Sequence, residues 1–516
     1  MGKKDKGKKK GKGAEKTAMK TDKKLMAKQK KLLEQIGEDD INDIVASLEA
    51  NEQRRKTVSE NIVPPPSPRS NFSFCAHPDK EELILFGGEF FNGQTLTVYN
   101  ELYFYNIPKN EWKLVMAPGG PGPRSAAQMV SVASDGGQIW LFAGEHSTPS
   151  QMQFYHYRDL WVFRIASRKW DKIDTKNGPS PRSGHRMIAH KKKLFVFGGF
   201  YDTGISYKYY NDVWIFSMET YQWQCINPSG SIKPAPRSAG CMSATPDGKI
   251  LVWGGYSKTA VKKEIDRGIT YSDMFALVPE KNDTSGLQWK WTSVKAGGLR
   301  PTPRGGVSLA VAANGKGYIF GGVLDVNEDE ENLDGQFSNE MHSLDLSSLT
   351  WRLVELTGKK DRKSTKDKAL DDNEEMETTT TSAPQVSTDG IFTITVGGSS
   401  SSQASKSKSK TTNLNVPSPR MKPGMAVCKG HLYLFGGEYE EGSKQYTLND
   451  FYSLDLHKMD EWKTLIKQDL TGCEWMESDS EGSGSDSGSD EDDDDDDDDD
   501  DDESNDDSDS SGMDTD

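Results

Sequence analysis

The chain repeats one pattern of apolar and polar positions six times. Each copy has a short apolar run that ends in a pair of small residues: LILFGG, IWLFAG, LFVFGG, ILVWGG, YIFGG and LYLFGG. The first four pairs end at Gly88, Gly144, Gly199 and Gly255, which are 55 or 56 residues apart. Short apolar runs that are rich in β-branched and aromatic residues and bounded by glycine indicate β-strands. A fixed period of this length is typical of a repeat fold.

Three further strand-like segments accompany each apolar run. One precedes the run and starts at a Pro-Arg pair, namely Pro68-Arg69, Pro123-Arg124, Pro181-Arg182, Pro236-Arg237, Pro303-Arg304 or Pro419-Arg420. Another follows the run after a loop and starts at Glu101, Asp159, Asp212, Asp273, Glu340 or Asp450. The last is marked by Trp112, Trp170, Trp223, Trp291, Trp351 or Trp462. Each unit therefore predicts four consecutive strands.

Six such units predict an all-β, six-bladed β-propeller. A four-stranded sheet has two faces to bury, so the sheets must stack face to face, and radial closure leaves only short, protected edges. The predicted blades are residues 65–117, 123–175, 181–228, 236–296, 303–356 and 417–467. Because each unit supplies its own four strands, the way the ring closes stays open. An extra edge strand from residues 57–63 on blade six is one solution.

The glycine pairs and the tryptophans are interpreted as structural. Glycine reaches positive φ and lets another backbone approach closely, as a sharp strand exit beside a neighbouring blade requires. Ala143 departs from the pair, so the local geometry of that turn is the open question there. The tryptophan rings offer large flat surfaces for packing blade against blade.

These residues resemble the kelch repeat family, whose blades carry the glycine pair, a following aromatic residue and then tryptophan. The resemblance covers residues 65–467, apart from an insert at 358–415. It implies a kelch-type propeller that binds a partner, similar to the members that lack accessory domains. It implies no well-defined enzymatic activity.

The segments outside the ring carry charge in blocks. The whole chain has a net charge of -16, yet residues 1–31 carry +11, and residues 474–516 contain 24 acidic residues and no basic ones. Such runs resist collapse and act as solvated interaction arms. We therefore expect a basic disordered or weakly helical tail at 1–38 and an acidic disordered tail at 474–516. The polar insert at 358–415 cannot form a core and is also expected to be disordered.

A short amphipathic helix is predicted at residues 39–56. Asp40 can cap it, and Ile41, Ile44, Val45 and Leu48 fall on one face at helical spacing. This apolar face either packs on the propeller or docks a partner, and the sequence leaves both roles open.

The sequence predicts no catalytic residues, no metal site and no cofactor. It has no phosphate-binding glycine motif, no nucleophile elbow and no histidine pair at metal-ligand spacing. Five widely spaced cysteines suit a reducing compartment, and Cys75, Cys241 and Cys428 lie in strand-like segments as expected core residues. No apolar run of eighteen residues and no signal peptide is present. We expect an intracellular protein of the nucleus, the cytoplasm or both, not secreted and without membrane contact.

The loops after the small-residue pairs hold the candidate binding residues. In a propeller these loops emerge on one rim, and aromatic surfaces of this kind are enriched in interface hot spots. The candidates are Phe90, Phe91, Phe154, Tyr155, His156, Tyr157, Tyr207, Tyr209, Tyr210, Lys262, Lys263 and Tyr439. Packing between adjacent long loops explains the same residues equally well.

The sequence favours a non-enzymatic interaction scaffold, a monomeric propeller that binds protein partners. Its acidic tail repels nucleic acid and either attracts basic protein clients or serves only to keep the chain in solution, and the sequence leaves both roles open. Only the Lys-rich N-terminus suits direct contact with nucleic acid, and it equally suits nuclear import or pairing with the acidic tail. The alternative is a substrate-recognition subunit of a ubiquitin ligase, a common role among kelch proteins. Two features of the sequence argue against this alternative. The residues before blade one are too few to form a BTB dimerisation domain. The short Leu and Cys motif of the other adaptor-linked class is also missing, because Glu52 follows Ser47-Leu48 at the position where that motif has cysteine.

Overall fold

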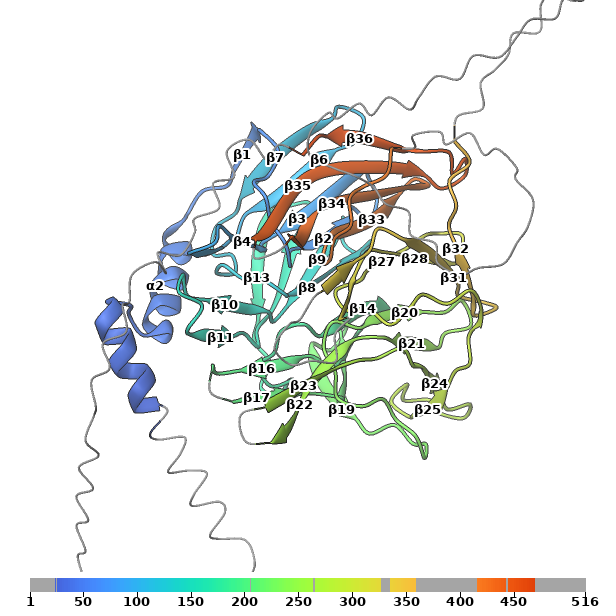
Figure 1. Ribbon diagram of the computed structural model, residues 1–516, viewed down its shortest axis with the longest axis horizontal. Helices are drawn as coiled ribbons and strands as arrows, with labels where there is room; N and C mark the ends of the chain where they lie inside the picture. Colours follow the sequence, from blue (N-terminus) through green and yellow to red (C-terminus); the bar gives the residue numbers. More distant parts are fainter. Residues whose placement is uncertain are drawn as a thin grey trace, which may run out of the picture. The chain divides into compact units, whose positions relative to one another are not determined.

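The computed structural model describes residues 24, 26–204, 206–262, 265–325, 335–358, 415–441 and 444–468. The lysine-rich segment 1–23, almost all of the predicted insert, and the acidic tail lie outside the described residues. The described part is nearly all β-structure, arranged as six antiparallel blades (Figure 1).

Each blade has four strands that follow one another along the chain, from the innermost to the outermost. Blade one contains β2 (Ser73–Ala76), β3 (Glu82–Phe86), β6 (Leu102–Asn106) and β7 (Glu111–Met116). Blade two contains β8 (Gln128–Val132), β9 (Gln138–Phe142), β12 (Leu160–Arg164) and β13 (Lys169–Ile173). Blade three contains β14 (Arg186–His190), β15 (Lys193–Phe197), β18 (Val213–Ser217) and β19 (Gln222–Ile226). Blade four contains β20 (Cys241–Ala244), β21 (Ile250–Trp253), β24 (Met274–Pro279) and β25 (Trp289–Ser293). Blade five contains β27 (Ser308–Val311), β28 (Lys316–Phe320), β31 (Met341–Asp345) and β32 (Thr350–Leu353). Blade six contains β33 (Gly424–Cys428), β34 (His431–Glu441), β35 (Lys444–Asp455) and β36 (Trp462–Ile466). A two-residue strand, β26 (Gly297–Gly298), pairs in parallel with β32.

The six inner strands form a closed circle. Strand β2 lies beside β8, and the circle continues through β14, β20, β27 and β33 back to β2. The predicted six-bladed propeller is therefore confirmed.

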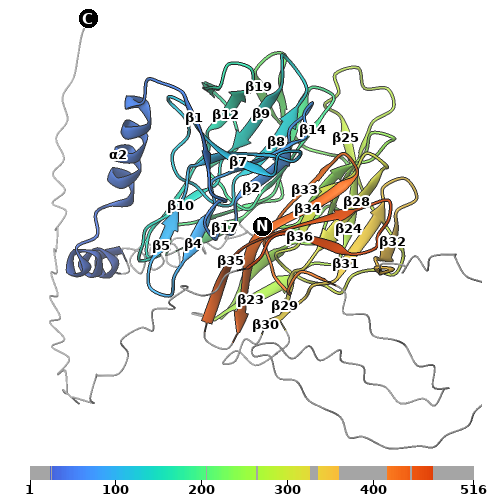
Figure 2. The ribbon, with the colours of Figure 1, turned by 90° about the horizontal axis from the view of Figure 1, so that it is seen from above.

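Two-stranded ribbons extend from one end of the blades, between the second and third strand of each. Five are separate pairs: β4 (Glu89–Phe91) with β5 (Leu96–Val98), β10 (Glu145–Ser147) with β11 (Phe154–His156), β16 (Phe200–Asp202) with β17 (Tyr207–Tyr209), β22 (Tyr256–Lys262) with β23 (Ile265–Thr270), and β29 (Val323–Asp325) with β30 (Gly335–Phe337). In blade six, β34 and β35 themselves continue into the ribbon. We call this end of the propeller the ribbon rim; several of its ribbons gather at one end in Figure 2.

The ring closes by packing rather than by a shared strand. The expectation that residues 57–63 extend blade six is wrong, because β1 (Ser59–Val63) pairs with β7 on the outer edge of blade one, with Val63 opposite Trp112. Blades six and one instead share an apolar cluster, in which the rings of Phe72 and Phe435 lie 5.6 Å apart. Each blade thus completes its sheet from its own repeat.

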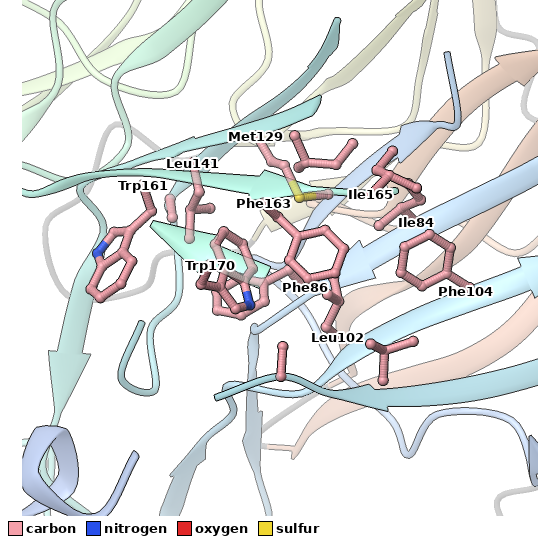
Figure 3. Close-up of a cluster of buried hydrophobic side chains, with 14 residues drawn as sticks. Ile84, Phe86, Leu102, Phe104, Met129, Leu141, Trp161, Phe163, Ile165 and Trp170 are labelled. Atoms are coloured by element: carbon pink, nitrogen blue, oxygen red, sulfur yellow. The ribbon is translucent and has the colours of Figure 1, made fainter. Parts of the chain in front are cut away.

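Tryptophans pack one blade against the next, as the sequence predicts. Between blades one and two, Trp170 of β13 lies 5.0 Å from Phe163 of its own blade and 5.6 Å from Phe86 of blade one (Figure 3). All three side chains belong to one buried cluster. Such aromatic pairs contribute about 0.5–1.5 kcal/mol each beyond their buried area.

A helical segment precedes the ring and rests on it. Residues 26–36 are helical, and α2 (Ile41–Arg54) follows, with the amide of Asn42 donating to Asp40 Oδ1 at 2.8 Å. Ile41 and Val45 pack on Tyr155 and Tyr157 of blade two, and Figure 1 shows α2 beside β10 and β11. Packing on the propeller is the role that the structure shows for this helix. None of the helices described here is long and apolar enough to cross a membrane.

Candidate functional site

A buried arginine anchors the entrance of every blade, just below the ribbon rim. In blade six, the guanidinium of Arg420 donates to both carboxylate oxygens of Asp450, at 2.5 and 2.7 Å, and to the carbonyl of Gly436 at 3.1 Å. The corresponding ion pairs in blades one to five are Arg69–Glu101, Arg124–Asp159, Arg182–Asp212, Arg237–Asp273 and Arg304–Glu340. Sequence reasoning noted both positions but did not pair them. The recurrence of an acid at the start of every third strand was the available signal.

Tyr157 belongs to this buried framework rather than to the surface. The guanidinium of Arg124 lies 3.7 Å above its ring, and its hydroxyl donates to the Pro123 carbonyl at 3.1 Å. Its side chain is 2% exposed, and desolvation raises the pKa of Tyr157 well above its usual range. Tyr210 repeats the arrangement under Arg182 at 4.2 Å, although it is only half-buried. The expectation that Tyr157 presents a binding surface is therefore corrected.

His156 is also buried. Its side chain points inward from β11, and Nε2 accepts a hydrogen bond of 2.9 Å from the Asp202 amide. Desolvation lowers the pKa of His156 to about 4, so the ring is neutral at physiological pH. Its predicted place on the rim surface is corrected as well.

The remaining aromatic candidates lie on the ribbons and are half-buried. They are Phe90 and Phe91 in β4, Phe154 and Tyr155 in β11, Tyr207 and Tyr209 in β17, and Tyr439 in β34. Several pack on neighbouring rings: Tyr209 stacks on Phe200 at 5.8 Å, and Tyr439 stacks on Tyr446 at 5.2 Å. Lys262 ends β22, and Lys263 lies outside the described residues. Loop packing and partial exposure thus occur together on this rim.

The turn residues that begin the inner strands line the ribbon-rim end of a central channel. The amide of Ala126 donates to the carbonyl of Asn71 at 2.8 Å, and similar bonds join Gly184 to Ala126, Ala239 to Gly184, and Lys422 to Gly306. These residues line a cavity of about 310 Å³ together with inner-strand residues from all six blades. We call this end of the cavity the channel mouth.

The residue after each small-residue pair lies beside one of these turns. Each pairs through its backbone with the residue just before the turn position. In blade order these residues are Glu89, Glu145, Phe200, Tyr256, Val323 and Glu438. Carboxylates therefore occupy this position in the consecutive blades six, one and two, and apolar or aromatic groups occupy it in blades three to five.

The three carboxylates and Lys422 form one electrostatic cluster. Lys422 Nζ donates to Glu438 at 2.6 Å, Asn71 donates to Glu89 at 2.5 Å, and Ser183 donates to Glu145 at 2.9 Å. Burial raises the pKa of Glu89, and it raises the pKa of Glu145 to about 8, with the Glu89 charge adding to the effect. Burial acts to lower the pKa of Lys422, but the surrounding glutamates outweigh it and raise that pKa.

Sequence reasoning missed this cluster. The signal was the identity of the single residue after each pair, which reads Glu, Glu, Phe, Tyr, Val and Glu along the chain. The same position belongs to a structural turn in every blade, and this role masks the difference in chemistry between the blades.

The cysteines take the predicted core positions. Cys75, Cys241 and Cys428 lie on inner strands of blades one, four and six and join apolar clusters. Desolvation raises the pKa of Cys75 to about 12 and that of Cys241 to about 11. Among the residues that the structure describes, no group of three or more His, Cys, Asp or Glu side chains is placed to hold a metal ion.

The repeats match the model of a known protein family. The model of the KLHDC2/KLHL20/DRC7 Kelch-repeats domain matches residues 35–255 and 233–374. Among solved structures, the one described as "Structure of YjhT" is 14% identical with a TM-score of 0.46, and the match covers 78% of this chain and 99% of that one.

Curated proteins with different names share the repeat at low identity. Host cell factor of Drosophila melanogaster is 26% identical over 315 residues, which are 56% of this chain and 19% of that protein. The dynein alpha chain of the Chlamydomonas reinhardtii flagellar outer arm is 28% identical over 204 residues, 37% of this chain and 4% of that one. N-(sulfonatooxy)prop-2-enimidothioate sulfolyase of Thlaspi arvense is 26% identical over 297 residues, 56% of this chain and 80% of that enzyme. The chain thus spans only a small part of the dynein chain and of host cell factor.

Proposed function

We propose that this chain, which belongs to the KLHDC2/KLHL20/DRC7 kelch-repeat family, is a non-enzymatic scaffold that binds protein partners through its ribbon rim. The observation that carries the proposal is the convergence of ribbons from all six blades on one rim. Half-buried aromatic side chains lie along these ribbons, and aromatic residues are enriched at protein interfaces. The blades supply a rigid support, and the ribbons supply the contact surface.

The partner is proposed to be a basic protein. The sequence places 24 acidic residues after residue 473, and three carboxylates lie around Lys422 beside the channel mouth. Complementary charge speeds encounter and disfavours acidic competitors. We further propose a monomeric intracellular protein of the nucleus or cytoplasm, which binds no cofactor. Segments such as QFYHYRDLW from Gln153 make the chain similar to kelch domain-containing protein four.

Affinity capture with the full chain tests the rim. Phe90→Ala combined with Phe154→Ala removes half-buried rings from the ribbons of blades one and two, and Tyr221→Ala is the control. Tyr221 lies in the turn between β18 and β19, at the opposite rim, and is 40% exposed. We expect the rim variant to lose partners that the control retains. Equal recovery from both would refute the rim as the contact surface.

The basic-client proposal has a separate test. Removing residues 474–516 is expected to reduce the recovery of basic proteins without changing the ring. Unchanged recovery would rule out a role of the tail in holding them. The alternative function, a substrate-recognition subunit of a ubiquitin ligase, requires that a cullin co-purifies with the full chain.

A further inference from the structure

Two layers of side chains from the inner strands line the central channel. The first residues of these strands are Ser73, Gln128, Arg186, Cys241, Ser308 and Gly424, which we call the polar layer. The second residues are Phe74, Met129, Met187, Met242, Leu309 and Met425, which we call the apolar layer. Every residue of both layers lines the cavity of about 310 Å³. The channel therefore offers polar and apolar contacts side by side.

Arg186 is larger than its place in the polar layer requires. Ser73 of blade one donates to the Ala127 carbonyl of blade two at 2.9 Å, and Ser308 of blade five makes the equivalent bond to blade six. In blade three, Arg186 makes this bond to the Gly240 carbonyl of blade four through Nε. A hydroxyl group is thus sufficient for this contact between blades, and the rest of the guanidinium is not needed for it.

The far end of the guanidinium is open to the channel. Nη1 of Arg186 donates to the His185 carbonyl at 3.2 Å, whereas Nη2 has no hydrogen-bond partner in the described part of the chain. The side chain is half-buried, and Nη2 is not among its enclosed atoms. A guanidinium has more N–H donors than two carbonyls can use, so several remain available to a ligand.

No negative charge balances Arg186. Among the residues that line the channel, only Arg186 and Lys422 are charged, and Lys422 Nζ is already paired with Glu438 at 2.6 Å. The Cys241 thiol lies close to Arg186, but burial raises its pKa to about 11, so the thiol is neutral. Desolvation lowers the pKa of Arg186, and no carboxylate among the described residues opposes this effect. A charge held away from water without a counter-ion is costly.

The charge of the site suits a carboxylate. A carboxylate forms charge-assisted hydrogen bonds with a guanidinium, and both groups are planar. One uncompensated positive charge matches one negative charge. A phosphate group carries more negative charge at neutral pH, and its excess would be desolvated without a partner.

The apolar layer suits an aliphatic chain attached to the carboxylate. Methionine side chains are flexible and polarisable and adapt to the shape of an apolar ligand. One of them, Met129, also belongs to the buried cluster between blades one and two (Figure 3), so the blades hold this wall in place. At about 310 Å³, the cavity lies at the lower end of the range for small-molecule sites, about 300–1,000 Å³. The ligand must therefore be small.

We propose that the central channel binds a short aliphatic monocarboxylate. Its carboxylate accepts hydrogen bonds from Nη2 of Arg186, and its aliphatic chain lies against the apolar layer. This site lies inside the propeller, so it is separate from the proposed protein-binding surface on the ribbon rim and does not depend on it.

The test uses the full chain and hexanoate as the probe. 1-Hexanol is the matched neutral ligand, and inorganic phosphate is an oxyanion without an aliphatic chain. Labelled methionine methyl groups report on binding by nuclear magnetic resonance, because four methionines belong to the apolar layer. Met274 of β24 and Met341 of β31 do not line the cavity and serve as internal controls. We expect hexanoate alone to give saturable shifts, confined to the methionines of the apolar layer.

Three variants complete the test. Arg186→Gln should weaken hexanoate binding by at least tenfold, because the amide carries no charge, and Arg186→Lys should keep more of the affinity because it retains one. Arg352→Gln, at an exposed arginine of β32 outside the channel, should have no effect. Unchanged signals from Met274 and Met341 verify that each variant is folded. If Arg186→Gln does not fold, the comparison of hexanoate with hexanol on the parent chain decides.

Four results would overturn the proposal. Equal binding of hexanol would show that the charge of Arg186 is not used, and equal binding of phosphate would show that the aliphatic chain is not recognised. Unchanged hexanoate binding to a folded Arg186→Gln variant would exclude this residue. Shifts confined to Met274 and Met341 would place the ligand outside the channel.

Discussion

The amide of Gly437 donates a 3.1 Å hydrogen bond to the carbonyl of Arg69, and this contact joins the last blade to the first. The same bond runs from Gly88 to Arg124, from Gly144 to Arg182, from Gly199 to Arg237 and from Gly322 to Arg420. Ring closure is therefore one more copy of an ordinary contact between blades. The second small residue of each pair is glycine for a reason within its own blade: at Gly437 φ is +100°, and a Cβ would lie 2.7 Å from the Met421 carbonyl oxygen.

Gly437→Ala should destabilise the propeller strongly. Alanine must adopt a backbone conformation that costs about 1–3 kcal/mol, and its Cβ also collides with the backbone of Met421. Gly315→Ala is the matched control, because φ there is +76° but no atom lies within 4 Å of the added Cβ. Chemical unfolding should show a larger loss for Gly437→Ala than for Gly315→Ala. Equal losses would mean that the close approach of Gly437 to the Met421 backbone contributes nothing.

The contribution of each arginine–acid pair to the unfolding free energy should depend on how deeply the pair is buried. In Arg420–Asp450 the side chains are 0% and 2% exposed, whereas in Arg304–Glu340 they are 7% and 51% exposed. Asp450→Asn leaves a buried guanidinium uncompensated and should cost roughly 3–5 kcal/mol in unfolding free energy. Glu340→Gln should cost less than about 1 kcal/mol, because solvent screens the pair. Denaturant titrations of the two variants would contradict this account if they gave similar losses.

Glu145 should make the propeller less stable as pH rises. Its folded-state pKa of about 8 lies above the unfolded value of about 4.3, so the folded state binds the proton more tightly. The resulting stabilisation is complete below about pH 4 and is lost as pH rises toward about 8. Glu145→Gln should therefore be more stable than the parent chain at pH 8.5, and the difference should shrink at pH 5. Melting temperatures across this range provide the measurement, and a constant difference would contradict the assignment.

The segment at residues 359–414 should be replaceable by a short linker. Both of its flanks reach the same part of blade six: the Gly358 amide donates to the Asp460 carbonyl at 3.0 Å, and Asn415 Nδ2 donates to the Trp462 carbonyl at 2.7 Å. The two ends are thus fixed close together by the ring itself. We expect the shortened chain to unfold in the same cooperative transition at a similar denaturant midpoint. A lower midpoint would show that the segment contributes to the fold.

The substitution Val45→Asp should detach the helix α2 from blade two without unfolding the ring. Val45 is 3% exposed and packs on the rings of Tyr155 and Tyr157, so Val45→Asp places a charge in that contact. Ala46→Asp, at an exposed position one residue away, is the control. Hydrogen exchange should accelerate over residues 41–54 in Val45→Asp alone, while the blades keep their protection. Equal exchange in both variants would mean that the apolar face does not hold the helix.

The fold was readable from the sequence because its signals repeat. Each copy of the glycine pair, the Pro-Arg turn and the tryptophan supports the others, and a strand register follows from two-residue alternation. Ring closure was not readable in the same way. Apolar and polar side chains alternate only weakly along residues 59–63, so this segment shows no preference for the outer edge of blade one over that of blade six. The pairing depends instead on which outer strand lies within reach, and in the folded chain that strand is β7.

The site was less predictable, because exposure is a property of tertiary packing. Tyr157 and Phe154 look equivalent in the sequence, yet one is buried under Arg124 and the other lies half-exposed on a ribbon. The raised pKa of Glu145 comes first from burial in the folded ring and then from charges on other blades, such as that of Glu89, 56 residues away. The sequence signal for Glu145 is its difference from Phe200, Tyr256 and Val323, which stand at the equivalent position of other repeats.

Hydrogen exchange of the full chain with a captured protein partner tests the central claim most directly. The account predicts new protection on the ribbons, β4–β5, β10–β11 and β16–β17 among them, and unchanged exchange in the turns at residues 107–110 and 457–459 on the opposite rim. Protection confined to those opposite turns, with the ribbons unaffected, would contradict the assignment of the ribbon rim as the binding surface.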